Sequence, residues 1–426
     1  MLAFLYGLSL YQAPPKYWET IVLSAVLLVL YGAGCLKLVP ALSSMLLGEE
    51  PHLKREGDRT FRRCGTRELF KLFLIVLLVR LLEFPLTYIV HYALYGYTGT
   101  FFEVQRLWLD FYHADTTFPL YGYMSNVFWI FTVNFNHARF IGSYLFTALA
   151  VVALYYLVQL DFDRRVARRT VRYFLLLPFS LVLMGTVPDG LFLLFAILTL
   201  LFLRKKMFPL ANLFAMLGVM THAVGVLLFF PVLVSYLSFL IGNVRSNREM
   251  EKGYIVKQVF NTLSILLIPI GVGLVMLYAK LRFGDALSLY RASFDADAVG
   301  FSGLFRWLDA AFDQTQFVGG DSFAVFAGTY FAQGAYLLFA LIMLLFASDT
   351  IPTAFSLLMA VTIPAVVLSG RVGDTARIVT VTAPFCITLA AKVKNRWLDA
   401  VFSALLLAGW IAYFFAFIAG NTGVTL

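Results

Sequence analysis

Apolar runs long enough to cross a membrane recur along almost the whole of this chain. Of its 426 residues, 61% are hydrophobic and 13% are charged, and the mean hydropathy is +0.83. A soluble protein of this size cannot bury so much apolar surface in one core, whereas a lipid bilayer requires such surface. The composition therefore predicts an all-α polytopic membrane protein, because a helix satisfies its backbone polar groups within one segment.

About twelve apolar segments are predicted to span the membrane, and a full crossing needs roughly 20 residues. They begin near Trp18, Lys71, Arg139, Tyr173, Leu191, Met207, Ala223, Phe260, Phe323, Ile351, Ile378 and Leu398. Some, such as Tyr173–Gly185 and Leu191–Leu203, are too short for a full crossing. Short helices that meet at Pro188 or Gly225 indicate a cavity reaching into the membrane. The stretch Phe118–Phe131 is predicted to be an interfacial or re-entrant helix.

Basic residues concentrate in five loops, and with twelve spans all five fall on one side of the membrane. These loops are Leu53–Lys71, Asp163–Arg169, Arg204–Lys206, Arg245–Lys252 and Lys392–Arg396. Basic loops tend to stay cytoplasmic, so both termini are predicted on the opposite face. Residues 1–70 are predicted to form an additional N-terminal transmembrane helix with a basic cytoplasmic loop, and residues 71–426 the main transmembrane domain. The net charge of +9 thus has a topological explanation, and no nucleic-acid surface is predicted.

The stretch "GTVPDGLF" (Gly185–Phe192) places a lone carboxylate, Asp189, between two strongly apolar runs. A charge at the centre of a membrane helix costs about 2.5–3.5 kcal/mol on the insertion scale. Asp189 is either the N-cap of a helix beginning at Leu191 or part of a functional site. His222, in "THAVG", is either a buried hydrogen-bonded histidine or a contact for a phosphate.

The first major outer loop carries most of the other candidate residues. If Phe101–Asp115 is helical, Glu103 and Asp110 share one face, and His113 continues it. This pattern suits a carboxylate held over a membrane cavity, and equally an amphipathic helix with solvated charges on the membrane surface. Asp115 ends the same stretch, and Arg282 begins a second outer segment, so both are candidates to line the cavity.

Two further clusters of charge are open to more than one interpretation. Arg371 and Arg377 flank Asp374, either as a surface ion-pair turn or as a pair of guanidinium groups suited to a lipid phosphate. Arg80 and Glu83 lie three residues apart in the second span, and we expect them to pair with each other.

No Walker A motif, dinucleotide fingerprint or zinc motif is present in the sequence. The three cysteines, at positions 35, 64 and 386, have neither metal-site nor disulfide spacing. No metal site is therefore predicted and no cofactor is required, although Asp110 and Asp115 could bind a divalent ion.

The segment Leu177–Leu237, with "LPFS", "VPDGLF", "RKK" and "THAVG", resembles the PIG-V-like mannosyltransferases of the GT-C superfamily of membrane glycosyltransferases. In that pattern Asp189 stands where Glu is usual and His222 where Arg is usual. The stretches "RFGDALSLY" (Arg282–Tyr290), "TTFPLYGY" (Thr116–Tyr123) and "SGRVGDTARIVTVTAPFCITLA" (Ser369–Ala390) are similar to further motifs of the family. The family's Trp-Asp pair in the first outer loop is absent, with "LWLDFY" and "FFEV" in that region instead.

The resemblance implies a GT-C-like bundle with a catalytic first major outer loop. It also implies transfer of a sugar, by preference mannose, from a polyprenyl-phosphate sugar donor to a glycan, glycolipid or protein acceptor. Asp110, with Glu103 as the second choice, would be the general base, and Asp189 would assist. The donor phosphate would be bound by Arg371, Arg377 and His222. The site would face away from the cytoplasm, in a bacterial plasma membrane or an endoplasmic reticulum membrane.

Two other classes of protein remain open. A lipid or solute transporter predicts an inverted repeat with broken helices in corresponding positions, and no convincing repeat is found. A non-catalytic subunit of a glycosylation complex is compatible with the absent Trp-Asp pair.

Overall fold

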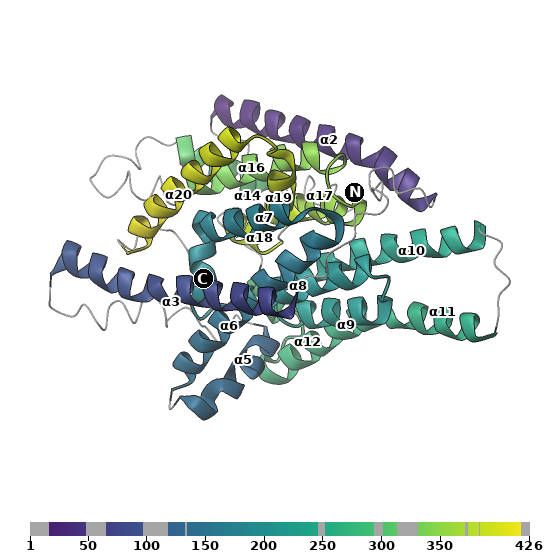
Figure 1. Ribbon diagram of the computed structural model, residues 1–426. Coiled ribbons are helices and arrows are strands. Elements are labelled where there is room, and N and C mark those ends of the chain that lie inside the picture. The colour runs from purple at the N-terminus through teal and green to yellow at the C-terminus, as the bar shows by residue number, and fades with distance from the viewer. Residues whose placement is uncertain are drawn as a thin grey trace.

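The computed structural model describes residues 17–47, 65–96, 118–132, 134–245, 252–293, 301–312, 331–370, 374–382 and 384–418. Within these ranges every regular element is a helix, as the sequence predicts (Figure 1). The helices pack into one bundle in which α2, in purple, lies along one edge (Figure 1). Helices α10 and α11 extend together beyond the rest of the bundle, joined by a 2.5 Å hydrogen bond between the Tyr236 and Thr262 hydroxyls.

The helices of the first part of the chain are α2 (Trp18–Leu46), α3 (Thr66–Tyr95), α5 (Pro119–Asn126), η1 (Val127–Phe131), α6 (Phe135–Asp161), α7 (Arg164–Leu176), η2 (Pro178–Met184), α8 (Asp189–Arg204), α9 (Phe208–Val219), η3 (Ala223–Leu228) and α10 (Phe229–Arg245). Those of the second part are α11 (Lys252–Ser264), α12 (Leu267–Phe283), α13 (Ser288–Ala292), α14 (Phe301–Phe312), α16 (Ala332–Ala347), α17 (Thr353–Leu368), α18 (Thr375–Val381), α19 (Pro384–Lys392) and α20 (Arg396–Ile418). The elements labelled η are 3-10 helices.

Among the residues that the structure describes, six helical segments are long and apolar enough to cross a membrane, as expected of an integral membrane protein. They are Trp18–Leu46, Thr66–Leu94, Phe135–Asp161, Ala223–Asn243, Gln258–Phe283 and Arg396–Ile418. Helices α9, α16 and α17 are apolar but shorter. The segment expected to start a span at Tyr173 is different, because Tyr173 lies inside α7 and the chain continues into η2 after a break at Leu177.

Several charged turns between helices lie at one end of the bundle, which we call the basic end. Arg204, at the end of α8, donates from Nε to Asp161 at the end of α6 over 3.1 Å. Lys392, at the end of α19, lies over the ring of Phe346 near the end of α16. Lys206 lies over the ring of Phe239 in α10. The described parts of several predicted cytoplasmic loops therefore share one end.

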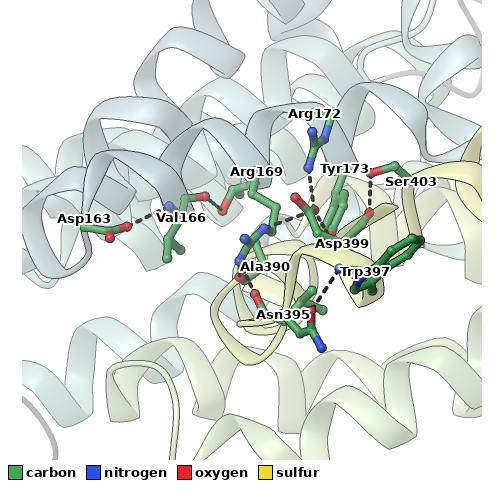
Figure 2. A network of polar contacts seen from close by, with 12 residues as sticks. Asp163, Val166, Arg169, Arg172, Tyr173, Ala390, Asn395, Trp397, Asp399 and Ser403 are labelled. Atoms are coloured by element: carbon green, nitrogen blue, oxygen red, sulfur yellow. Dashed lines mark hydrogen bonds and ion pairs between the residues drawn. The ribbon is translucent and has the colours of Figure 1, made fainter. Parts of the chain in front are cut away.

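Helix α7 is fastened to this end by a polar network centred on Asp399 (Figure 2). The carboxylate accepts a hydrogen bond from the Tyr173 hydroxyl at 2.7 Å and an ion-paired hydrogen bond from Arg172. Arg169 Nε lies 3.1 Å from the same oxygen. Arg169 also donates to the carbonyls of Ala390 and Val393, and so satisfies orphan carbonyl groups where α19 ends.

The pairing expected within α3 is confirmed. Arg80 Nη1 donates to Glu83 Oε1 at 3.0 Å, and the two side chains are 1% and 7% exposed. Tyr144 of α6 donates to the Arg80 carbonyl, so the pair lies at the interface between α3 and α6. Two charges that attract at short range are tolerated in an apolar interior where a lone charge is not.

We predict that Asp399→Asn lowers the free energy of unfolding by about 1–3 kcal/mol, because the charged acceptor of Tyr173 and Arg172 is lost. Asp163→Asn, at the N-cap of α7, is the matched Asp-to-Asn control; Asp399 itself lies in α20. Asp163 caps α7 by accepting from the Val166 N–H, and Asn caps as well as Asp. Thermal unfolding of both variants in detergent micelles measures the difference, and equal midpoints would contradict this account.

Candidate functional site

Three of the residues selected from the sequence meet at one point inside the bundle. Arg377 of α18 donates from Nε to Asp189 Oδ1 at 2.7 Å, and His222 Nε2 lies 3.9 Å from the same oxygen. The side chains of Asp189, Arg377 and His222 are 1%, 12% and 15% exposed. We call these three residues the polar cluster. The structure brings them together, while their chemical roles stay predictions.

Asp189 is not the cap of the helix that follows it. Helix α8 begins at Asp189 itself, Pro188 occupies the N-cap position, and no side chain makes a capping hydrogen bond. The capping interpretation is therefore wrong, and the carboxylate is directed to Arg377 instead. Its position in the first turn is still favourable, because a helix N-terminus carries partial positive charge. The second oxygen, Oδ2, is buried and accepts no hydrogen bond from any described residue.

The turn before Asp189 is fixed by hydrogen bonds from hydroxyl groups of α6. Ser143 donates to the Val187 carbonyl at 3.2 Å, and Thr147 donates to the Leu183 carbonyl at 3.1 Å. At Gly190 an added Cβ would lie 2.4 Å from Thr147 Oγ1. Helix α8 therefore starts in close contact with α6 at its glycine, which fixes the position of the carboxylate one residue earlier.

His222 caps η3 and enters the polar cluster from a different direction. Its Nδ1 accepts from the Val224 N–H at 3.2 Å, so the neutral ring carries its proton on Nε2, the nitrogen nearest Asp189. The turn is tight, because a Cβ on Gly225 would lie 2.5 Å from the backbone of Gly218. Burial, and then the positive charge of Arg377, lower the pKa of His222 to about 4, so the imidazole is a neutral donor at pH 7.

Arg377 is positioned through the first turn of α18. Gln333 of α16, which is 2% exposed, accepts from the Ala376 N–H at 2.8 Å. The Nη nitrogens of Arg377 form no hydrogen bond within the described part of the chain, so the outer edge of the guanidinium is available to an anion. Sequence reasoning missed Gln333, although an amide inside the apolar run "FAQGAYLL" is the kind of residue that signals a buried hydrogen bond.

Two further segments singled out in the sequence, Thr116–Tyr123 and Arg282–Tyr290, have described residues close to the turn at His222. Leu120 N–H donates to the carbonyl of Met220, two residues before His222. Phe118 packs edge-on against Tyr290, with ring centroids 5.3 Å apart, and belongs to the same apolar cluster as Met220. The start of α5, the turn at His222 and the "FGDALSLY" segment therefore adjoin one another.

The remaining predicted site residues are not part of this cluster as described. Glu103, Asp110, His113, Asp115 and Arg371 lie outside the described residues. Arg282 is exposed at the end of α12 and makes no hydrogen bond or ion pair with another described residue. Among the described residues no group of three His, Cys, Asp or Glu side chains could hold a metal ion.

Comparison with protein-family models and with curated proteins gives no match for this chain. The class that the fold establishes is an all-α integral membrane protein with a buried charged cluster. The resemblance to GT-C mannosyltransferases rests on the motifs alone, and what it implies about activity is a proposal.

We predict that Asp189→Asn destabilises the protein by about 1–3 kcal/mol, because it removes the nearest counter-ion of the Arg377 guanidinium, whose side chain is 12% exposed. The double variant Asp189→Asn/Arg377→Met should lose less free energy of unfolding than Asp189→Asn alone, since the guanidinium is then absent. Chemical unfolding in mixed micelles compares the two. A double variant that is less stable than Asp189→Asn alone would contradict the buried-charge explanation.

We also predict that the stability of the protein falls as the pH drops from about 6.5 towards 4, the interval between the ordinary and the lowered pKa of His222. In this interval the unfolded chain binds a proton at His222 that the folded chain does not bind. His222→Asn, which retains a capping oxygen, should remove this part of the pH dependence. Unfolding midpoints measured across the interval provide the test, and an unchanged slope in the variant would refute the assignment.

Proposed function

We propose that this protein is a GT-C-type membrane glycosyltransferase. It moves a sugar, by preference mannose, from a polyprenyl-phosphate sugar to a glycan, glycolipid or protein acceptor, with inversion at the anomeric carbon. In this proposal about twelve segments cross the membrane. The basic end is cytoplasmic and the polar cluster opens to the other face, in a bacterial plasma membrane or an endoplasmic reticulum membrane.

The observation that carries the proposal is the guanidinium of Arg377, held by Asp189, with no hydrogen bond from its Nη nitrogens to any residue that the structure describes. The leaving group in this reaction is a lipid phosphate, on which negative charge accumulates as the glycosidic bond breaks. A fixed guanidinium and a neutral imidazole N–H are suitable donors to that phosphate, and no rearrangement is needed when the charge develops. The reaction requires no cofactor.

An apolar groove beside the cluster supports a lipid-linked donor. Its volume is about 60 Å³, and it is lined by Leu27, Leu28, Tyr31, Leu304, Leu337, Leu341, Ile363, Pro364, Val367 and Leu368. Leu337 lies one helical turn from Gln333, which bonds to the residue before Arg377. The Tyr31 hydroxyl donates to the Ala360 carbonyl, so the one polar atom of the lining is satisfied within the protein. A hydrocarbon chain suits such a lining.

The general base in this proposal is a carboxylate of the first outer loop, with Asp110 preferred to Glu103. Asp189 has one oxygen engaged by Arg377, which suits it to positioning the phosphate-binding guanidinium. The loop is followed by Phe118, and the adjoining α5 bonds to Met220 beside the cluster, which supports a role for the loop at this site.

The experiment is a transfer assay with a polyprenyl-phosphate sugar and purified protein in micelles. We predict that Asp110→Asn lowers turnover by about 10²–10⁴-fold, as expected for a lost general base, while donor binding is largely retained. Glu103→Gln is the parallel variant. Arg377→Lys should weaken donor binding, because Lys cannot reproduce a bidentate contact. Arg306→Lys, an exchange at an exposed arginine of α14, is its matched control.

The outcomes separate the alternatives. If Glu103→Gln loses turnover and Asp110→Asn keeps it, the base assignment reverses. If both keep it, the loop does not hold the base and Asp189 becomes the leading candidate. A wild-type protein that moves labelled lipid across vesicles without transferring sugar would be a transporter. One that does neither would suit a non-catalytic subunit.

A further inference from the structure

Helix α7 lies at the basic end of the bundle. It is not one of the helices that are long and apolar enough to span a membrane. At its start Arg164 donates from Nε to Glu68 at 2.7 Å, and Glu68 is in the first turn of α3. Near its end, Arg172 and Tyr173 bind Asp399 in the first turn of α20 (Figure 2). A helix that reaches the ends of two apolar helices in this way runs along the membrane surface.

The same depth is indicated by Trp397, which is 80% exposed in the first turn of α20 beside Asp399. Tryptophan is enriched where membrane hydrocarbon meets the polar headgroups. The apolar face of α7 is not turned to lipid, because Ala167, Val171 and Phe174 are buried in the protein core. The polar face therefore points away from the bundle at the level of the headgroups.

That polar face is a stripe of arginine. Arg164, Arg168 and Arg172 follow one another at four-residue spacing, and Arg165 lies beside them. Arg164, Arg168 and Arg172 are 53%, 65% and 47% exposed. Further exposed cations, Lys205, Lys206, Lys394 and Arg396, continue the positive surface around the basic end.

The nearby carboxylates of the described residues are occupied, and within this part of the chain two arginines of the stripe have no close counter-ion of their own. Asp163 caps α7, Asp161 binds Arg204, and Asp399 binds Arg172. Glu68 binds Arg164 closely, and Arg168 lies 3.8 Å from the same carboxylate at the limit of an ion pair. Arg165 has no ion pair or hydrogen bond with any residue that the structure describes.

We propose that the arginine stripe of α7 binds the headgroups of anionic phospholipids in the leaflet that surrounds the basic end. A guanidinium forms two parallel hydrogen bonds to a phosphate, and basic amphipathic helices in the membrane plane attract anionic lipid. The lipid is favoured over a soluble polyanion because α7 is fixed at headgroup depth by its contacts with α3 and α20. This binding is independent of the proposed transferase activity.

The test counts lipids retained on the full-length protein. The protein is reconstituted in nanodiscs of phosphatidylcholine alone or mixed with phosphatidylglycerol, then released and weighed by native mass spectrometry. We expect preferential retention of phosphatidylglycerol by the wild type. Arg165→Gln/Arg168→Gln should weaken retention about 5- to 25-fold, since one basic residue near an anionic surface contributes about 1 kcal/mol, or about fivefold.

Two matched variants make the result decisive. Arg165→Lys/Arg168→Lys keeps both charges and should retain most of the binding, which also shows that α7 tolerates substitution. Lys280→Gln/Arg306→Gln removes two exposed cations of α12 and α14, outside the basic end, and should retain lipid as the wild type does. Equal loss in the two Gln variants would overturn the proposal. Unchanged retention in Arg165→Gln/Arg168→Gln, or displacement of the lipid by inorganic phosphate, would also overturn it.

Discussion

A charge inside an apolar bundle must be neutralised by another charge, and this requirement organises the interior of the protein. Asp189 and Arg377 satisfy it across 188 positions of sequence, and Arg80 and Glu83 satisfy it within one helix. The first pair ties α8 to α18, so two helices far apart in the chain are held in one relative position. Because the pair is buried, anything that separates its members exposes both to the full penalty of an unpaired charge.

The polar cluster as a whole is close to electrically neutral. Asp189 and Arg377 cancel, and His222 is uncharged at pH 7 because burial and Arg377 lower its pKa. At the position of His222 the imidazole provides an N–H donor without adding a second positive charge beside Arg377.

The polar cluster could be selected from the sequence for a simple physical reason. Asp189, His222 and Arg377 are polar residues between apolar runs with no topological purpose, and such residues are expensive unless they have partners. The sequence could not assign those partners, because a carboxylate at a helix start is as consistent with capping as with an ion pair. Gln333 escaped notice because its role depends on a contact with α18 that no local pattern encodes.

The course of α7 could not be predicted from the sequence either, because it depends on contacts with distant residues. A run of apolar residues beginning at Tyr173 resembles the start of a span, but its first members belong to a helix whose course is set by distant carboxylates. Glu68 holds one end of α7 and Asp399 the other, and both lie in the first turns of long apolar helices. The charged residues of the basic end therefore fix α7 across the bundle, away from the polar cluster, because Asp189 and Arg204 stand at opposite ends of α8, about 22 Å apart.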